Sequence, residues 1–124
     1  MPAEVGPHSM EYLSDRVRAF AEARDWTQFH TVRNLILALV GEVGELAAEI
    51  QWIGDDGISV ALRDPAKRET VSAELADVFN YLLRIADVLE VDLGSALLEK
   101  LEVNEKRYPR DKARGSSAKY TDYE

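Results

Sequence analysis

Two stretches with helical periodicity, residues 31–53 and 65–89, constrain more than any other feature how this chain can fold. Apolar residues recur in each at steps of three and four, which is the spacing of a helix with one apolar face. Each stretch also carries two acidic residues three positions apart: Glu42 and Glu45 in the first, Glu74 and Asp77 in the second. Because residues three apart lie on the same face of a helix, each helix projects two carboxylates in one direction.

Four carboxylates that converge between two packed helices indicate a binding site for a divalent metal ion. Without a cation the like charges would repel one another, and some would be forced to protonate. The acids have no accompanying cluster of Cys or His. This favours a hard cation, Mg²⁺ or alternatively Mn²⁺, of the kind that bridges to substrate phosphates. The alternative is a pair of solvated helices with ordinary surface acids, since Glu is a good helix former.

The acids lie beside the apolar faces and not within them. The predicted core stripe consists, on the first helix, of Ile36, Leu39, Val43, Leu46, Ile50 and Ile53, and on the second, of Val71, Leu75, Val78, Leu82, Ile85 and Leu89. The acids are rotated from the centre of each stripe by roughly a quarter to a third of a turn. An aromatic residue follows on the same side, Trp52 on the first helix and Tyr81 on the second. This arrangement predicts a half-buried pocket rather than an open surface.

The composition excludes several classes of function. With 124 residues, of which 46% are hydrophobic, the chain is expected to form one domain with a real core. A net charge of −8 and a pI near 4.8 argue against binding to nucleic acid or to an anionic membrane, because an acidic surface attracts neither polyanion. The sequence has no Cys, which excludes disulfides and thiol catalysis, and it shows no signal peptide or membrane span. Cytoplasmic residence is therefore expected.

Four helices and almost no strand are predicted. The helices are expected over residues 9–23, 31–53, 65–89 and 92–107. Ser9 and Asp92 are plausible N-caps, and Pro65 suits the first turn of its helix. Residues 54–64 carry glycines and three aspartates and are predicted to form a surface connection.

The chain is accordingly expected to have three parts. Residues 1–9 would be a flexible leader, residues 10–108 the helical domain, and residues 109–124 a C-terminal tail. The tail is polar but keeps Tyr120 and Tyr123, and a purely disordered tail has less reason to keep aromatics. We therefore expect it to pack on the domain or on a neighbouring subunit. Subunit contacts are also suggested by the start of the helix over residues 31–53, which is apolar on every side.

An ordered series of motifs resembles the MazG-like family of all-α nucleotide pyrophosphohydrolases. Besides the E-x-x-E and E-x-x-D pairs, the series consists of Asp25-Trp26, Phe29-His30, Arg33-Asn34-Leu35, Ala38 to Glu42, Gln51-Trp52, Lys100, Asn104, Arg107-Tyr108-Pro109, Arg114-Gly115-Ser116 and Lys119-Tyr120-Thr121-Asp122. It covers about residues 12–122. Within the family the chain is most similar to the dCTP pyrophosphatases. It departs from them at Glu49 and Asn80, where apolar residues would be expected.

The resemblance implies a fold, a reaction and a metal. The fold would be a MazG-like four-helix bundle that forms a homo-oligomer, a tetramer built from dimers or alternatively a dimer. The reaction would be Mg²⁺-dependent hydrolysis of dCTP, and of modified forms such as 5-methyl-dCTP, to the monophosphate and pyrophosphate, as nucleotide-pool house-cleaning. The metal ligands would be Glu42, Glu45, Glu74 and Asp77. Either Glu42 or Glu45 would instead act as the general base on the attacking water.

The resemblance also implies a set of substrate-binding residues. These would be Trp26, His30, Trp52, Tyr81, Lys100 and Asn104. Aromatic rings that stack on a base contribute about 1 to 3 kcal/mol each. Lys100 and Asn104, one turn apart, would reach phosphate and sugar or support a metal ligand. The alternative for the aromatics is a core or interface position, and for His30 a role in capping or packing at a helix start.

Three alternative functions stay open. A dUTP or broad-spectrum pyrophosphohydrolase is the nearest, because base choice rests on a few hydrogen bonds that the sequence does not display. A di-iron or di-manganese carboxylate bundle would pair Glu with His at E-x-x-H, and neither acidic pair has that His. A non-enzymatic helical interaction module would have solvated acids and no metal dependence.

Overall fold

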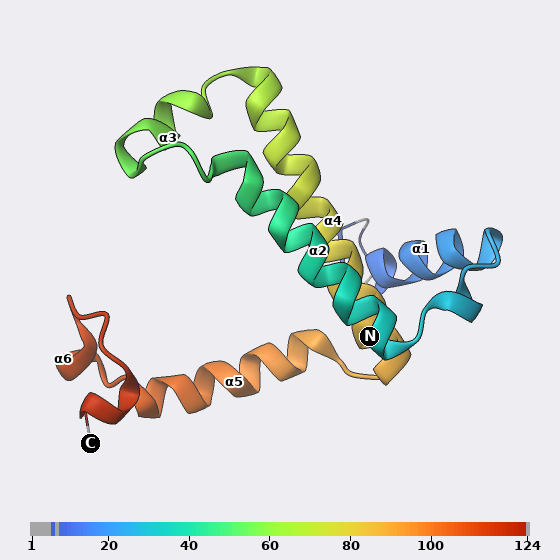
Figure 1. Ribbon diagram of the computed structural model, residues 1–124. Coiled ribbons are helices and arrows are strands. Elements are labelled where there is room, and N and C mark those ends of the chain that lie inside the picture. The colour runs from blue at the N-terminus through green and yellow to red at the C-terminus, as the bar shows by residue number, and fades with distance from the viewer. Residues whose placement is uncertain (1–5, 7, 124) are drawn as a thin grey trace. The chain divides into compact units, whose positions relative to one another are not determined.

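The computed structural model describes residue 6 and residues 8–123, and this part of the chain is helical, without strands (Figure 1). The elements are α1 (Met10–Ala23), η1 (Thr27–Phe29), α2 (Val32–Ile50), α3 (Asp55–Ala61), α4 (Pro65–Leu89), α5 (Leu93–Arg107), α6 (Arg110–Ala113) and η2 (Tyr120–Tyr123). They form two compact units, divided between Glu90 and Val91. Most of the expected leader, residues 1–5 and 7, lies outside the described residues.

A capping residue precedes each of the four long helices, and two of these caps, Ser9 and Asp92, were predicted from the sequence. Ser9, Thr31, Asp64 and Asp92 each accept a hydrogen bond from a backbone N–H in the first turn of the helix that follows. Such caps satisfy N–H groups that have no partner within the helix. Pro65 occupies the first turn of α4, as expected. The prediction for α2 was too long at its C-terminal end, because the helix stops at Ile50 and not at Ile53.

The connection between α2 and α4 is more ordered than the sequence predicted. Residues 54–64 were expected to form a surface connection between two of four helices, and they contain a further short helix, α3, that was not predicted. Asp55 and Asp56 lie in its first turn, where negative charge interacts favourably with the helix dipole. The glycines that indicated a loop are Gly54, which is the N-cap, and Gly57, which the short helix accommodates.

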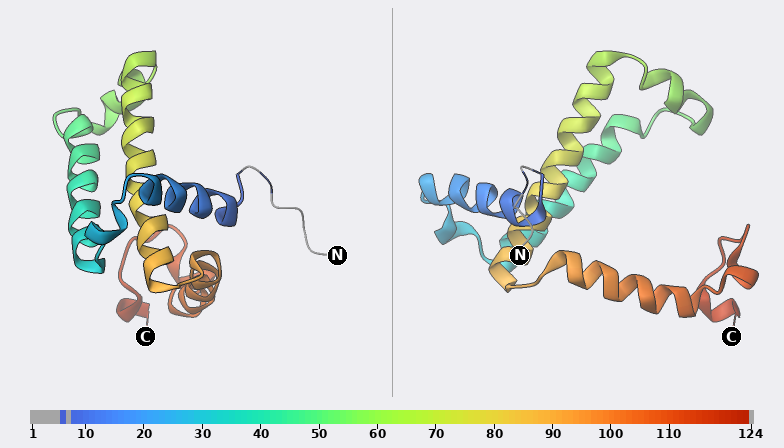
Figure 2. Two further views of the ribbon diagram at one scale, coloured as in Figure 1. Left: turned by 90° about the vertical axis from the view of Figure 1, so that its right-hand side faces the viewer. Right: turned by 180° about the vertical axis from the view of Figure 1, so that it is seen from behind.

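α2 and α4 run antiparallel side by side, and α1 packs across α4 (Figure 2). The hydrophobic side chains buried most completely are Ala21, Leu35, Leu83 and Ala86. Much of the predicted core stripe is not buried in a single chain, and its most exposed members are Val43, Leu75 and Leu89, about half exposed. The prediction was wrong in treating the whole stripe as core, because two paired helices cover only the side chains along their line of contact.

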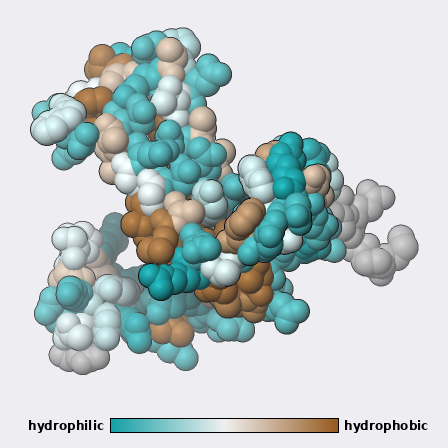
Figure 3. Space-filling view, turned by 45° about the vertical axis from the view of Figure 1, so that its right-hand side comes forward, coloured by the Kyte–Doolittle hydropathy of each residue, from teal (hydrophilic) through white to brown (hydrophobic). Residues whose placement is uncertain are grey.

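Exposed apolar side chains are a general feature of the described surface. Leu37 and Val40 on α2 are 58% and 62% exposed. Leu97 and Leu98 on α5 are 59% and 66% exposed. Figure 3 shows such side chains, in brown, at the surface of one face of the molecule. No described helix has both the length and the apolar character needed to cross a membrane.

The C-terminal residues fold back on the end of α5. The ring of Tyr108 lies edge-on to the rings of Tyr120 and Tyr123, at centroid distances of 6.3 and 5.9 Å. The guanidinium of Arg107 lies 4.5 Å from the centre of the Tyr120 ring. Lys112 Nζ donates a hydrogen bond of 3.0 Å to the carbonyl oxygen of Tyr123. The tail is therefore an ordered aromatic and basic cluster within the second unit.

Candidate functional site

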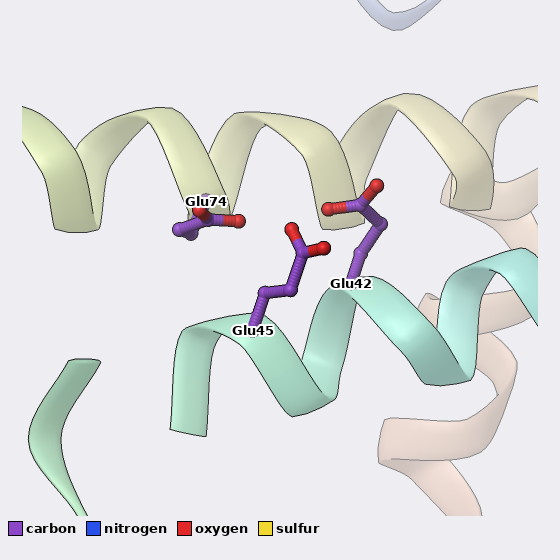
Figure 4. Close-up of side chains that lie close together, drawn as sticks. All are labelled: Glu42, Glu45 and Glu74. Atoms are coloured by element: carbon purple, nitrogen blue, oxygen red, sulfur yellow. The ribbon is translucent and has the colours of Figure 1, made fainter. Parts of the chain in front are cut away.

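Three of the four predicted metal ligands come together between α2 and α4. Glu42 and Glu45 project from α2 towards Glu74 on α4 (Figure 4). One carboxylate oxygen of each residue lies within 4.8 Å of an oxygen of the other two. The three-residue offset on α2 places both of its acids on the side that faces α4, as the sequence predicted.

Two of these carboxylates carry oxygens that are buried without a hydrogen-bond donor. Oε2 of Glu42 and Oε2 of Glu74 have almost no solvent-accessible area and no partner among the described residues. The Glu42 and Glu74 residues are half-buried, whereas Glu45 is exposed. A buried polar atom without a partner costs free energy, so these oxygens indicate that a positively charged group belongs beside them.

The electrostatics of the cluster support the same conclusion. Burial raises the pKa of the Glu42 carboxyl above its ordinary value of 4.5, and the negative charge of Glu45 raises it further. Burial, followed by the charge of Glu45, likewise raises the pKa of Glu74. Loss of solvent and proximity of like charges both disfavour the ionised form. The arrangement is therefore strained when all of its carboxylates are charged, and a cation would relieve that strain.

The donor set fits a hard divalent cation. Its ligand atoms are carboxylate oxygens, with no Cys or His in the group. Mg²⁺ and Mn²⁺ prefer such oxygens and keep open positions for water and phosphate. Glu42, Glu45 and Glu74 are therefore the residues that would hold the ion.

Asp77, the fourth predicted ligand, lies beside this group and not within it. Its charge raises the pKa of both Glu42 and Glu74, so it is close enough to contribute to the field of the site. Asp77 is exposed and lines an open groove of about 660 Å³ between α1 and α4. Asn80 and Phe20 line the same groove. Asp77 therefore lies between the carboxylate cluster and the groove that α1 and α4 form.

Glu49, an unexpected acid on α2, is engaged by a lysine from α4. Lys67 Nζ lies 2.7 Å from Glu49 Oε2, and both side chains are about a quarter exposed. Glu49 follows Glu45 by one helical turn, and its charge contributes to the raised pKa of Glu74. Because Glu49 is paired with Lys67, it is not free to serve as a further ligand of the cluster.

The predicted base-stacking aromatics differ in their environment. Trp52 lies just after the end of α2 and is 89% exposed, so it is not a core residue of the single chain. Trp26 is 44% exposed and packs edge-on against Phe20, with ring centroids 5.7 Å apart. Tyr81 is half-buried on α4, one turn beyond Asp77.

His30 takes part in a network of charged side chains that the sequence did not reveal. Its Nδ1 accepts a hydrogen bond of 3.0 Å from Nε of the buried Arg84. Arg84 and Arg18 both donate to Asp87. The signal that could have pointed to this network is a charged residue inside the apolar run Leu82-Leu83-Arg84-Ile85-Ala86.

Lys100 and Asn104 belong to the second unit. Both lie on α5, one turn apart as predicted. Lys100 is exposed and Asn104 is half-buried. Their spacing presents an ammonium and an amide on one side of the helix.

Comparison with protein families matches residues 40–123 to the MazG-like family. The matched span is more than half of the chain, and it contains both acidic pairs and the C-terminal tail. The chain belongs to the MazG-like family. The family resemblance that the motifs indicated is thereby confirmed, as is the all-helical fold.

Several relatives of this MazG-like chain have names that describe an activity. Human dCTP pyrophosphatase 1 is 50% identical over 103 residues, and the bovine (Bos taurus) protein of that name is 48% identical over the same length. Each alignment covers 83% of this chain but 61% of the relative, so the chain spans about three fifths of the length of these relatives. The crystal structure of a pyrophosphatase from Archaeoglobus fulgidus superimposes with a TM-score of 0.77 and is 36% identical. That comparison covers 87% of this chain and 99% of the archaeal one.

Proposed function

We propose that this MazG-like protein is a Mg²⁺-dependent nucleoside triphosphate pyrophosphohydrolase that converts dCTP to dCMP and pyrophosphate. The observation that carries the proposal is the pair of buried, unpartnered oxygens of Glu42 and Glu74 beside Glu45. Such a cluster supplies a cation site at which a phosphate chain can be held. The names of the mammalian relatives support dCTP as the substrate.

The side chains divide the chemistry between them. Glu42, Glu45 and Glu74 would hold Mg²⁺, and Asp77 at the edge of the cluster would complete the ligand set. When bound, Mg²⁺ neutralises charge on phosphate oxygens. Alternatively, one of the two carboxylates on α2, Glu42 or Glu45, would act as the general base and accept the proton of the attacking water instead of binding the metal.

The nucleoside would be recognised by exposed and half-buried rings. Trp52 and Trp26 offer open faces on which a base can stack, at about 1 to 3 kcal/mol per ring. Tyr81 lies on α4 near the acids, and His30 would donate a hydrogen bond to the base. Lys100 and Asn104 would contact phosphate and sugar.

We further propose that the active form is a homo-oligomer, a tetramer built from dimers or a dimer. The support is the apolar surface that a single chain leaves uncovered, which includes Leu37 and Val40 on α2 and Leu97 and Leu98 on α5. Identical copies of the chain are always present together at the same concentration, and most soluble oligomers are built from identical copies. A second copy is therefore the proposed partner of this surface. Each of these two pairs lies on one helix, and large exposed apolar patches mark interaction surfaces.

The physiological role would be house-cleaning of the nucleotide pool in the cytoplasm. Excess dCTP and modified forms such as 5-methyl-dCTP would be removed before polymerases use them. A dUTP-selective or broad-spectrum enzyme is the nearest competing function, since the base-reading hydrogen bonds decide between them.

Pyrophosphate release from a panel of nucleotides tests the proposal. The panel contains dCTP, 5-methyl-dCTP, dUTP and CTP, each with and without Mg²⁺. We expect the highest kcat/KM for the deoxycytidine nucleotides and no turnover without the metal. A non-enzymatic module would show no turnover of any nucleotide and no rise in Tm with Mg²⁺ and dCTP, whereas a ligand at 100 times its Kd stabilises the fold by about 2.7 kcal/mol.

A further inference from the structure

Arg84 is buried more completely than any other charged side chain of the described residues. It is 6% exposed and lies on α4, seven residues after Asp77 and three after Tyr81, on the same face of the helix. Its Nε donates to Nδ1 of His30 at 3.0 Å, and its Nη1 donates to Asp87 at 2.5 Å. Since both ends of the guanidinium have partners, the side chain is held in one orientation.

Asp87 is shared between two arginines. It also accepts hydrogen bonds from Arg18 on α1, from Nε at 3.0 Å and from Nη2 at 2.6 Å. The charged groups around His30 are therefore Arg84 and Asp87 from α4 and, through Asp87, Arg18 from α1. Arg18 is paired with Asp15 as well as with Asp87, so the charge that acts directly on His30 is that of Arg84, which repels an added proton.

The hydrogen bond from Arg84 fixes the protonation of His30. An arginine N–H can only donate, and arginine does not lose its proton in proteins. Nδ1 of His30 must therefore accept with its lone pair, which leaves the ring proton on Nε2. Burial, followed by the charge of Arg84, also lowers the pKa of His30 below its ordinary value of 6.5. At neutral pH His30 is then a neutral ring with one donor, Nε2–H.

We propose that Arg84 is a positioning residue for the nucleotide, which holds His30 as a neutral imidazole whose Nε2–H donates to an acceptor on the pyrimidine base. The inference rests on the proposed function, which places His30 among the residues that bind the nucleoside. Without Arg84 the ring would exchange between its two tautomers and would present an acceptor part of the time. The contact to a base acceptor would then be lost from part of the population.

The wild-type protein tests the fixed tautomer without a substitution in the network. His8 and His30 are the two histidines of the chain, so ¹⁵N NMR of labelled histidine with His8→Gln assigns both rings. We expect His30 to be the Nε2–H tautomer alone, to titrate below pH 6.5, and to shift at Nε2 when dCTP is added. An Nδ1–H tautomer, or a mixture of both tautomers, in the wild type overturns the proposal. Because this measurement needs no substitution in the network, it tests the proposal even when variants at position 84 do not fold.

Two arginine variants separate positioning from stability. Arg84→Met removes the donor to His30, whereas the control Arg18→Met removes the other cation from Asp87 and leaves the bond to His30. For Arg84→Met we expect both tautomers, a His30 midpoint closer to 6.5, and a KM for dCTP raised about 5- to 10-fold with kcat changed less than about 2-fold. Arg18→Met should lower Tm but keep the wild-type tautomer and KM.

The pH dependence of KM for dCTP is a measurement that would not change if Arg84 were only a structural residue. Because a protonated His30 donates from both ring nitrogens, acidification through its midpoint should narrow the difference in KM for dCTP between Arg84→Met and the wild type. A lower Tm in Arg84→Met with unchanged tautomer, KM and pH profile would show that the network is structural and refute the positioning role. A wild type that has the Nε2–H tautomer but neither binds nor hydrolyses dCTP would refute the proposed function instead.

Discussion

The most direct consequences of the site concern single carboxylates. Glu45 is exposed, so Glu45→Gln removes a negative ligand without emptying core volume. We expect this variant and Asp77→Asn to lose hydrolysis by about 100-fold or more, the scale of losing one preorganised charged group. Both should fold, and the metal-free Glu45→Gln protein should be at least as stable as the wild type, because one repulsion in the cluster is removed.

Steady-state hydrolysis of dCTP against Mg²⁺ concentration, together with Tm in chelator, measures these effects. Glu69→Gln is the matched control, since Glu69 is an exposed acid on the same helix as Glu74. Near-normal turnover of both site variants at low Mg²⁺ would contradict the metal site.

The aromatic residues give a second prediction at this scale. Trp52→Ala and Tyr81→Ala should raise KM for dCTP about 10-fold, as expected for the loss of one stacked ring. Trp52 is 89% exposed, so its replacement should change the free energy of unfolding by less than about 0.5 kcal/mol. Phe29→Ala is the control, because Phe29 is another exposed aromatic and is not assigned to the pocket. Initial rates and Tm of each variant test this prediction. If the variants keep the wild-type KM but have a much lower Tm, the two rings are packing residues and not part of the nucleotide pocket.

Among the secondary-structure elements, the C-terminal segment is the least expected from its polar composition. Residues 110–123 are tied to α5 through the rings of Tyr108, Tyr120 and Tyr123. Six of the 15 basic residues of the chain lie between Lys106 and Lys119, in a protein of net charge −8. Such a segment is suited to contact an anionic triphosphate.

Truncation after Pro109 should therefore lower kcat/KM about 10-fold or more, as expected for the loss of one or more charge-assisted phosphate contacts. Circular dichroism should show that the helical content of α1 to α5 is retained. Tyr120→Ala removes one ring but no charge, so it is the comparison variant and should lower kcat/KM less than the truncation does. Full activity of the truncated protein, with rapid hydrogen exchange throughout residues 110–123, would instead identify a solvated tail.

Local sequence signals predicted the helices well and their surroundings less well. The caps Ser9 and Asp92 and the first-turn Pro65 are recognised from neighbouring residues, and a helix begins at each of these places. The three-residue offset likewise predicted that Glu42 and Glu45 face the same way. The bond between Arg84 and His30 joins residues 54 positions apart, and such a contact depends on how helices pack and not on local spacing. The exposure of Leu75 was missed for the same reason, because periodicity shows that a face is apolar but not what covers it.

At the scale of the whole molecule, the exposed apolar surface predicts that a charge introduced into it would dissociate the proposed oligomer. Val40→Glu places a carboxylate on a residue of α2 that is 62% exposed, so it should cost a single chain little. In the proposed oligomer the same carboxylate would be buried without a partner, at a cost of several kcal/mol. We expect sedimentation equilibrium to show a smaller species for this variant, and an unchanged one for Arg33→Glu, an exposed polar control on the same helix. An identical mass for wild type and Val40→Glu would contradict an interface at this position.

The small number of side chains that one chain buries by itself has a kinetic consequence. Leu35 is the largest side chain that is fully enclosed, and Leu83 is the next large one among the described residues. So little enclosed apolar area contributes little driving force for folding. In the proposed oligomer the remaining burial would come from other copies, and such a protein has no well-defined stability at infinite dilution. Refolding should then be second order in protein, with a rate that rises with chain concentration. Specific activity measured at nanomolar enzyme should fall with time after dilution, and substrate present during dilution should slow that loss.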